Sequence, residues 1–387
     1  MRRGPTGSYE VFSIGGEAVQ AFVPRPLPPE PPLVFQGLLQ PLLERALLAV
    51  GRLDSLSTLL PDPSLFLYAY VRKEAVLSSQ IEGTQSSLSD LLLFELDEAP
   101  GAPFDDVAEV SSYVRALEHG LARLRGGFPL SARLIREIHA ELLASGRGAD
   151  KAPGEFRRTQ NWIGGTRPGT ALFVPPPHTA VPDAVSDLER FLHAEGDGLA
   201  VLIKAGLAHV QFETIHPFLD GNGRIGRLLI TLILYHAGLL REPLLYLSLY
   251  LKEHRSEYYR LLDEVRRDGD WEDWLAFFLR GVAETGDGAV ATVRRLTATF
   301  EADRKRIEAQ GRRSGSALRV QAALQARPVT TLQDAAERAS LSFPTATKGM
   351  ALLLDLGIAR ELTGRKRNRV FAYDRYLAVL SEGTEAP

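Results

Sequence analysis

HPFLDGNGRIGR, residues 216–227, is the stretch that decides the fold of this 387-residue chain. It lies between two apolar stretches with helical spacing, residues 199–213 and 225–236, so the sequence predicts a loop that leads directly into a helix. Gly221 and Gly223 allow the backbone to turn sharply there and to expose its N–H groups. Because the N-terminus of a helix attracts negative charge, the loop predicts a binding site for phosphate.

One other interpretation of the same residues is excluded by their context. Residues 221–226 satisfy the pattern G-x-G-x-x-G, which in dinucleotide-binding proteins follows a buried β-strand. Here the preceding residues have helical spacing, and five residues separate them from the first glycine. The sequence therefore argues against a nicotinamide or flavin dinucleotide site.

The side chains of the segment suit chemistry on a nucleotide phosphate. Arg224 and Arg227 are three residues apart, so they lie on one helix face, where two guanidinium groups can hold a polyphosphate. Asp220 is a hard oxygen ligand of the kind that Mg²⁺ prefers. Histidine ordinarily has a pKa near neutrality, so a residue such as His216 can accept a proton from an attacking hydroxyl group. The residues alone point to attack by a hydroxyl on a magnesium-bound nucleotide.

The segment resembles the Fic motif, H-x-F-x-[DE]-G-N-G-R-x-x-R, and fills every defined position of it. The resemblance implies a mostly helical fold that transfers AMP from ATP to a hydroxyl side chain of a target protein, with attack on the α-phosphorus and loss of pyrophosphate. It implies that His216 is the general base and that Asp220 binds Mg²⁺. The residues implied to bind ATP in this segment are Gly221, Asn222, Gly223, Arg224, Ile225, Gly226 and Arg227, with an anion hole at 221–223 and the γ-phosphate on Arg227.

A second resemblance concerns regulation. Ser78-Ser79-Gln80-Ile81-Glu82-Gly83 matches the inhibitory pattern [ST]-x-x-x-E-[GN] at the end of an expected helix, N-terminal to the Fic core. In the N-terminally autoinhibited class of Fic proteins, this resemblance implies that the Glu82 carboxylate pairs with Arg227 and denies that side chain to the γ-phosphate. Ser78, Glu82 and Gly83 are thus the expected inhibitory residues.

The family resemblance also extends to two other parts of the site. Residues 161–175 have the composition of a short hairpin and match the flap that pairs with the backbone of a target, with Trp162, Ile163 and Phe173 as contact residues. Tyr258 and Tyr259 resemble the position that flanks the adenine, although the residues after them are more charged than an adenine pocket suggests.

The last part of the chain forms a separate pattern. Residues 332–341, 342–357 and 358–373 read as helix, turn, helix and a basic two-stranded hairpin, which is the order of a winged helix-turn-helix. The expected wing carries Arg365, Lys366, Arg367 and Arg369. Such a run is compatible with a solvated hairpin tip or with binding to DNA, and both interpretations stay open.

Composition limits the function classes. The net charge of −3 gives no general attraction to nucleic acid, and the absence of cysteine excludes disulfides and cysteine nucleophiles. The remaining histidines show no metal-binding spacing. No apolar stretch reaches the length of about 20 residues that a membrane helix needs, and the first residues lack the apolar core of a signal peptide. A cytoplasmic protein without membrane contact is the expectation.

These observations combine into one prediction. The fold class is mostly α, a helical Fic fold with a short β-hairpin flap and a C-terminal winged helix-turn-helix domain. The expected divisions are an N-terminal arm and inhibitory region at 1–110, with a proline-rich extended arm at 1–32, a catalytic core at 111–285, a helical connector at 286–312 and the winged helix at 313–387. The expected function is a protein adenylyltransferase that uses ATP and Mg²⁺. A DNA-binding regulator, removal of AMP and use of another nucleotide are the alternatives, and the target protein and a homo-oligomeric state stay open.

Overall fold

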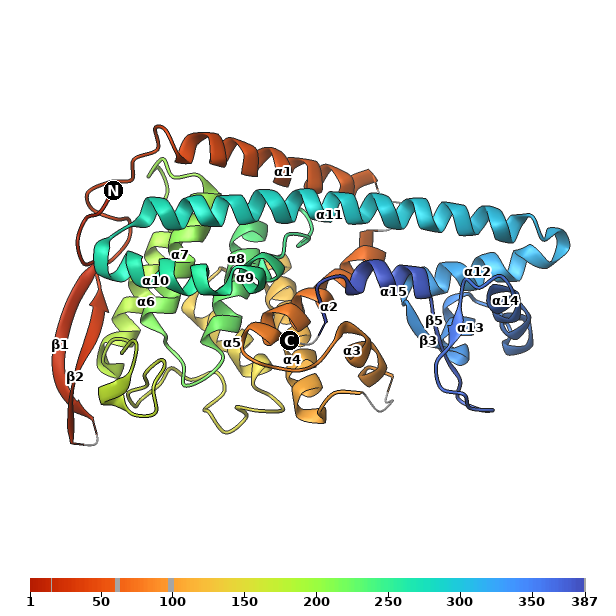
Figure 1. Ribbon diagram of the computed structural model, residues 1–387, viewed down its shortest axis with the longest axis horizontal. Coiled ribbons are helices and arrows are strands. Elements are labelled where there is room, and N and C mark those ends of the chain that lie inside the picture. Colours follow the sequence, from red (N-terminus) through yellow and green to blue (C-terminus); the bar gives the residue numbers. More distant parts are fainter. Residues whose placement is uncertain (15, 60–62, 97–100, 386–387) are drawn as a thin grey trace. The chain divides into compact units, whose positions relative to one another are not determined.

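The computed structural model describes residues 1–14, 16–59, 63–96 and 101–385 and forms two compact units. The first unit contains residues 1–54 and 112–286, and the second contains residues 55–111 and 287–387. The chain passes between the units inside three helices: α1 (Leu39–Leu59), α4 (Phe104–Arg125) and α11 (Trp271–Glu308) (Figure 1). Packing therefore groups residues 55–111 with the C-terminal part of the chain, whereas the sequence predicts consecutive domains.

The first unit is built around two buried helices that are adjacent in the chain. Their order with the surrounding helices is α5 (Ala132–Leu142), α6 (Val181–His193), α7 (Val201–Ile215), α8 (Asn222–His236), α9 (Ser248–Glu253) and α10 (Arg255–Asp268). All but two residues of α7 and most of α8 are buried, as expected for helices that are apolar on every side. Gly226 lets α8 approach α7, because a Cβ at this position would meet the Glu213 carboxylate.

Two hairpins lie side by side in the first unit. Strands β1 (Gly7–Ile14) and β2 (Glu17–Pro24) form an antiparallel pair in a region where the sequence predicts only an extended arm. Ile163 and Phe173 form an isolated antiparallel bridge within the expected flap. The Phe22 N–H donates to the Val174 carbonyl at 2.9 Å, so β2 is hydrogen-bonded to the end of the flap. The β1–β2 pair thus supports the flap from its outer side.

The second unit joins two helices from the N-terminal half to the C-terminal elements. These elements are α2 (Pro63–Ile81), α3 (Leu88–Phe94), a 3₁₀ turn η3 (Gly311–Arg313), α12 (Ser314–Ala326), β3 (Val329–Thr331), α13 (Leu332–Arg338), α14 (Phe343–Asp355), β4 (Arg360–Glu361), β5 (Val370–Ala372) and α15 (Asp374–Ser381). The three strands form an antiparallel sheet in the order β3-β5-β4.

The second half of α11 anchors these C-terminal elements. Its Phe300 packs against the rings of Tyr373 and Tyr376, with centroids 5.6 and 5.1 Å apart. The fully buried Asp303 accepts a hydrogen bond from the Tyr373 hydroxyl at 2.9 Å and pairs with Arg306 at 2.7 Å. These contacts fix α15 and β5 on the helix within this unit.

The structure confirms a mostly helical chain with a small hairpin, and most of the expected helices lie within a few residues of their predicted bounds. Within the described ranges no helix combines the length and the apolar character needed to cross a bilayer. The largest difference is α11, which is one continuous helix where the sequence predicts two, at residues 271–281 and 286–310. Its Gly281 and Gly286 lie where a Cβ would press on Tyr250 and Ala49, so these glycines permit close packing against the helix.

Candidate functional site

The site forms where α7 ends and α8 begins. His216 ends α7 with φ 49° and ψ 60°, a left-handed conformation that is uncommon for residues other than glycine. Gly221 precedes α8 with φ 77°, and no side chain caps this helix end. The first N–H groups of a helix have no partner within the helix, so the start of α8 offers donors to an anion.

Asn222 closes the loop between the two helices. Its Oδ1 accepts from the Phe218 N–H, and its Nδ2 donates to the Phe218 carbonyl, both at 2.9 Å. Asn161, at the start of the flap, donates to the same carbonyl at 2.9 Å. The Asn222 side chain is therefore occupied in shaping the loop, so the donors that this loop can offer to an anion are backbone N–H groups.

The Asp220 carboxylate lies at the open edge of the loop. Its Oδ1 accepts from the Gly221 N–H at 2.6 Å and lies 3.3 Å from an Arg224 nitrogen, while the side chain is 36% exposed. Gly148 approaches so closely that a Cβ there would lie 2.6 Å from Oδ2. This leaves a cradle beside one accessible carboxylate oxygen.

This cradle fits Mg²⁺ that arrives with a nucleotide. Magnesium in nucleotide sites is typically held by one or two carboxylates, with phosphates and waters completing its shell. Among the described residues no group of three or more ligating side chains could hold a metal by itself. By its chemistry, a single carboxylate such as that of Asp220 is suited to a magnesium ion that also binds phosphates and water.

A residue outside the motif, His139 on α5, supports Asp220. Its ring stacks on Phe218 with centroids 3.7 Å apart and planes 6° apart. Nδ1 accepts from the Gly154 N–H at 2.9 Å, so the proton is on Nε2, which donates to the Asp220 carbonyl at 3.1 Å. Burial lowers the pKa of His139 to about 4, which keeps this ring neutral.

Arg157 is a second supporting residue that the motif does not contain. Its guanidinium group is buried and donates to the carbonyls of His216 at 2.9 Å and Pro176 at 2.5 Å. Its own N–H donates to the Pro217 carbonyl at 2.9 Å. Nothing in the local sequence distinguishes this arginine from Arg158 beside it, because its role depends on contacts with residues about 60 positions away.

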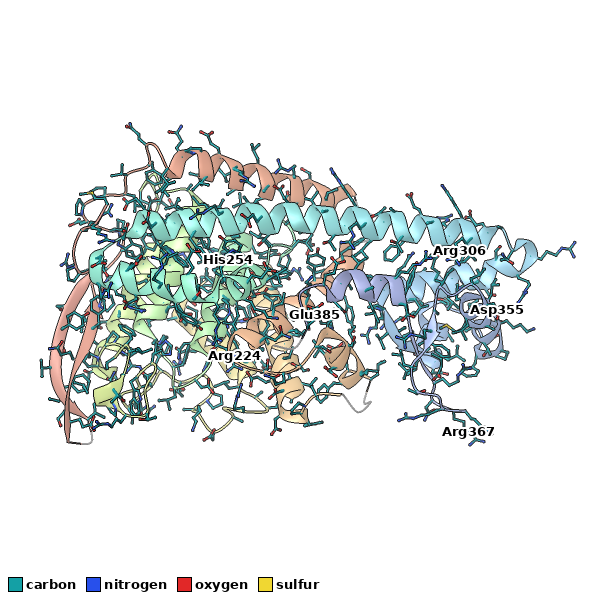
Figure 2. The ribbon with its side chains drawn as sticks, viewed as in Figure 1. Arg224, His254, Arg306, Asp355, Arg367 and Glu385 are labelled. Carbon is teal, nitrogen blue, oxygen red and sulfur yellow. The ribbon has the colours of Figure 1, made fainter. Side chains whose placement is uncertain are left out.

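His216 ends α7, Asp220 lies on the loop, and Arg224 and Arg227 lie on the first turns of α8, where Figure 2 labels Arg224. Both arginines are buried at this helix. Ile225 points into the core, and Gly226 serves the contact with α7, so these two predicted ATP-binding residues support the helix.

Comparison with known families matches this architecture. Residues 40–122 match the Fic/DOC family N-terminal model, and residues 129–234, which contain the loop and α8, match the Fic/DOC family model. The chain thus contains a Fic/DOC family N-terminal domain and a Fic/DOC family domain.

Curated relatives of this Fic chain carry the name protein adenylyltransferase Fic. The protein from Drosophila grimshawi is 31% identical over 188 residues, which are 48% of this chain and 36% of the relative. The protein from Culex quinquefasciatus is 32% identical over 202 residues, 51% of this chain and 37% of the relative. The chain thus matches little more than a third of the length of these relatives.

Solved structures show the same fold. A Fic family protein from Desulfovibrio desulfuricans aligns with a TM-score of 0.60 at 19% identity, over 89% of this chain and 98% of that one. A Fic domain containing signaling protein from Bacteroides thetaiotaomicron aligns with a TM-score of 0.51 at 20% identity, over 65% of this chain and 94% of that one.

The flap of this Fic protein is short and well supported. Ile163 donates to the Phe173 carbonyl at 2.8 Å, and the Phe173 N–H donates back at 3.1 Å. The Phe173 ring packs under the Arg266 guanidinium group, whose central carbon is 4.0 Å from the ring centroid. Trp162 is partly exposed, so of the three predicted contact residues it is the one most open to solvent.

The two predicted adenine-flanking tyrosines differ in their surroundings. Tyr258 is fully buried, and its hydroxyl donates to His209 Nε2 at 2.8 Å, while His209 Nδ1 donates to the Gly226 carbonyl at 3.0 Å. Burial lowers the pKa of His209 to about 4, which fits this acceptor role. Tyr259 is 42% exposed, and its ring centroid lies 5.0 Å from that of Tyr258. The structure therefore places Tyr258 in the Fic core and only Tyr259 at a surface.

The expected inhibitory residues lie at the end of α2, in the second unit. Ser78 is buried, Glu82 follows the helix on an exposed turn, and Gly83 has φ 101°. Between them, Gln80 donates to the Ser86 carbonyl at 2.9 Å and to the Thr384 carbonyl at 3.0 Å. This segment is thus held within its own unit by a side chain of the motif.

Proposed function

We propose that this Fic protein is a protein adenylyltransferase, which transfers AMP from ATP to a hydroxyl side chain of a target protein. The observation that carries the proposal is the loop between α7 and α8. It presents His216, an accessible Asp220 carboxylate and the uncapped start of α8 within a few residues of one another. The name of the curated relatives supports the same activity.

In the proposed reaction, His216 removes the proton from the target hydroxyl group. The hydroxyl oxygen forms a bond to the α-phosphorus as the bond to the bridging oxygen of pyrophosphate breaks, and pyrophosphate leaves with that electron pair. The N–H groups at the start of α8, together with Arg224 and Arg227, hold the negative charge of the phosphates. Asp220 would hold Mg²⁺, which supplies neutralisation of phosphate charge when bound.

The flap and α10 complete the proposed site. An extended segment of the target would pair with the flap by strand addition, next to Trp162, Ile163 and Phe173. Tyr259, on the exposed side of α10, is the better placed of the two tyrosines to contact the adenine, because the hydroxyl of Tyr258 is used inside the core.

Transfer of labelled AMP from ATP, to the protein itself or to a cell lysate, tests the proposal. Because autoinhibition would mask activity, the Glu82→Gly variant is the starting protein, and Glu82→Gly with His216→Ala is its matched control. Equal labelling by the two proteins at saturating Mg²⁺ would refute the function. Parallel reactions with GTP, CTP and UTP, and with a target that already carries AMP, examine the alternatives of another nucleotide and of AMP removal.

We also propose that Glu82 inhibits transfer by pairing with Arg227. The inhibitory pattern at residues 78–83 and its position at the end of a helix support this. A coupling of about 1–3 kcal/mol would repress activity roughly 5- to 150-fold. Glu82→Gly should therefore raise AMP labelling by a factor in that range, whereas equal labelling by wild type and variant would exclude this role of Glu82.

DNA binding by the C-terminal elements is a second candidate function. The order α12, β3, α13, α14 and a β4–β5 hairpin matches the order expected of a winged helix-turn-helix, and the loop between β4 and β5 carries exposed Arg365, Lys366 and Arg367, of which Figure 2 labels Arg367. If these residues contact phosphates, duplex binding weakens with salt, and replacing Arg365 and Arg367 by alanine lowers the log–log salt slope by about 2. An unchanged slope would exclude the hairpin from binding.

A further inference from the structure

Arg157 is a buried cation whose acceptors in the structure are carbonyl and amide oxygens. Its side chain is only 2% exposed, and it donates to four backbone carbonyls: Nε to His216 at 2.9 Å, Nη2 to Pro176 at 2.5 Å and to Ile215 at 3.4 Å, and Nη1 to Thr159 at 3.5 Å. Among the described residues no carboxylate lies within ion-pair distance of it. Burial lowers its pKa to about 10, which reflects the cost of placing this charge inside the protein.

Two of these carbonyls belong to His216, whose backbone the site must hold in an unfavourable conformation, and to its neighbour Ile215. The last carbonyls of a helix have no partner within it, and His216 also adopts positive φ, which costs about 1 kcal/mol or more for a residue with a side chain. Arg157 supplies donors to both Ile215 and His216 and, through its own N–H, to Pro217. One residue thus satisfies the backbone on three successive residues.

We propose that Arg157 is a positioning residue for His216. By fixing the carbonyls on both sides of the His216 Cα, it holds the left-handed conformation that directs the imidazole group toward the attacking hydroxyl. The inference rests on the proposed adenylyl transfer with His216 as the base. It assigns Arg157 no contact with ATP, because its donors are used by the carbonyls around the loop.

The fork of the guanidinium group is essential to this role. The carbonyls of His216 and Pro176 accept from different nitrogens of the group, Nε and Nη2. Lysine keeps the charge but has one nitrogen on a flexible stem, so it cannot hold both groups in one geometry. Arg157→Lys therefore keeps the positive charge and removes only the guanidinium geometry that fixes the two carbonyls.

Steady-state kinetics in the Glu82→Gly background test the proposal, with Arg158→Lys as the matched control because this neighbour is 86% exposed. A small displacement of a catalytic group can lower a rate by about 100-fold. We expect Arg157→Lys to lower kcat by about that factor while KM for ATP changes less than threefold, and Arg158→Lys to behave like the parent. A kcat within threefold of the parent, or a loss shared equally by kcat and ATP affinity, would overturn the positioning role.

A second measurement does not depend on activity. In protein with ¹³C-labelled histidine, the His216 signal is identified by its loss in His216→Ala, and Arg157→Lys should shift this signal while leaving that of His178 unchanged. An unshifted His216 signal in folded Arg157→Lys overturns the inference. If the Glu82→Gly parent transfers no AMP but the signal shifts, the proposed function fails and the positioning role stands. Should Arg157→Lys not fold, Arg157→Gln, which retains one side-chain donor group, takes its place in both measurements.

Discussion

The amide of Asn222 shows how much of the site depends on a single side chain. Its two hydrogen bonds to Phe218 are buried and close the loop that separates His216 from α8. A neutral hydrogen bond contributes about 1 kcal/mol, and leaving the Phe218 groups unpaired adds to the loss. We expect Asn222→Ala to destabilise the first unit by about 2–3 kcal/mol.

Tryptophan fluorescence is suited to this measurement, because all three tryptophans lie in the first unit. Asn161→Ala is the control: it removes one donor to the Phe218 carbonyl and leaves the bonds from Asn222, so its effect should be less than half as large. A similar loss for both variants would show that Asn222 does not have this special role.

His209 makes stability depend on pH. Its pKa is about 4 in the folded chain against an ordinary value of 6.5, because burial disfavours the charged form. Above pH 6.5 the residue is neutral in both states and adds no pH dependence. As the pH falls from 6.5 toward 4, only the unfolded chain gains the proton, so stability is lost.

Between pH 7.5 and pH 5, this one residue should lower the free energy of unfolding of the first unit by about 2 kcal/mol. Denaturant unfolding followed by tryptophan fluorescence at the two pH values measures the effect. His209→Gln should reduce the pH-dependent loss by that amount, whereas Tyr258→Phe, which keeps the buried imidazole, should retain it. If the free energy of unfolding of His209→Gln fell as much between the two pH values as that of wild type, the prediction would be wrong.

The supporting residues explain how far the sequence could predict the site. Residues 216–227 have the pattern of a phosphate loop because their chemistry is contained within twelve consecutive positions. His139 and Arg157 reach the same loop from residues 81 and 59 positions away along the chain. No local pattern marks them, because a histidine or arginine acquires such a role only when distant segments pack together.

At the scale of elements, the glycines of α11 have two different structural roles that the sequence does not distinguish. Residues 271–281 and 286–310 read as two helices because glycine disfavours helix interiors. In the structure α11 runs through them, and a Cβ on Gly281 would lie 2.6 Å from the Tyr250 ring, whereas one on Gly288 would meet nothing within 4 Å. The first glycine permits contact between helices, and the second has no such packing role.

Alanine substitutions at these two glycines form a matched pair of variants. Gly281→Ala should destabilise the first unit by about 1–3 kcal/mol, because the methyl group must displace the Tyr250 ring. Gly288→Ala should stabilise the helix by about 0.5–1 kcal/mol, because alanine favours helix and meets no neighbour. Thermal unfolding followed by helical circular dichroism measures both, and a change of the same sign in the two variants would contradict this account of α11.

The β1–β2 hairpin is the element that the sequence analysis missed. Residues 7–24 contain apolar and polar residues in partial alternation, but the prolines that follow them favoured an extended arm. The pairing becomes favourable through tertiary contacts: Glu17 pairs with Arg167 at 2.7 Å, and the Phe22 ring lies near Phe173. Because this strand pair depends on contacts with a flap far away in the sequence, the pattern of residues 7–24 alone predicts it only weakly.

At the scale of the whole molecule, the described residues after α15 and the proposed inhibitory segment, residues 78–83, belong to the second unit. Gln80 lies within the inhibitory pattern, yet its amide donates to the Thr384 carbonyl, 304 residues further along the chain. On the same helix, the Lys73 ammonium group donates to the Glu382 carbonyl at 2.7 Å. Thr384 itself is buried. The residues after α15 thus hold α2 close to the turn that carries Glu82.

If Glu82 inhibits as proposed, loosening this hold should weaken inhibition. Gln80→Ala removes donors to buried carbonyls, so we expect faster hydrogen exchange at residues 78–84 and a severalfold rise in AMP labelling over wild type. Gln333→Ala, at an exposed position of α13 in the same unit, is the control and should change neither measurement. In the double variant with Glu82→Gly, the added Gln80→Ala should give no further rise, because the inhibitory carboxylate is already absent. A rise that adds fully to that of Glu82→Gly would place the effect of Gln80 outside autoinhibition, and unchanged exchange would show that the contact with Thr384 does not hold α2.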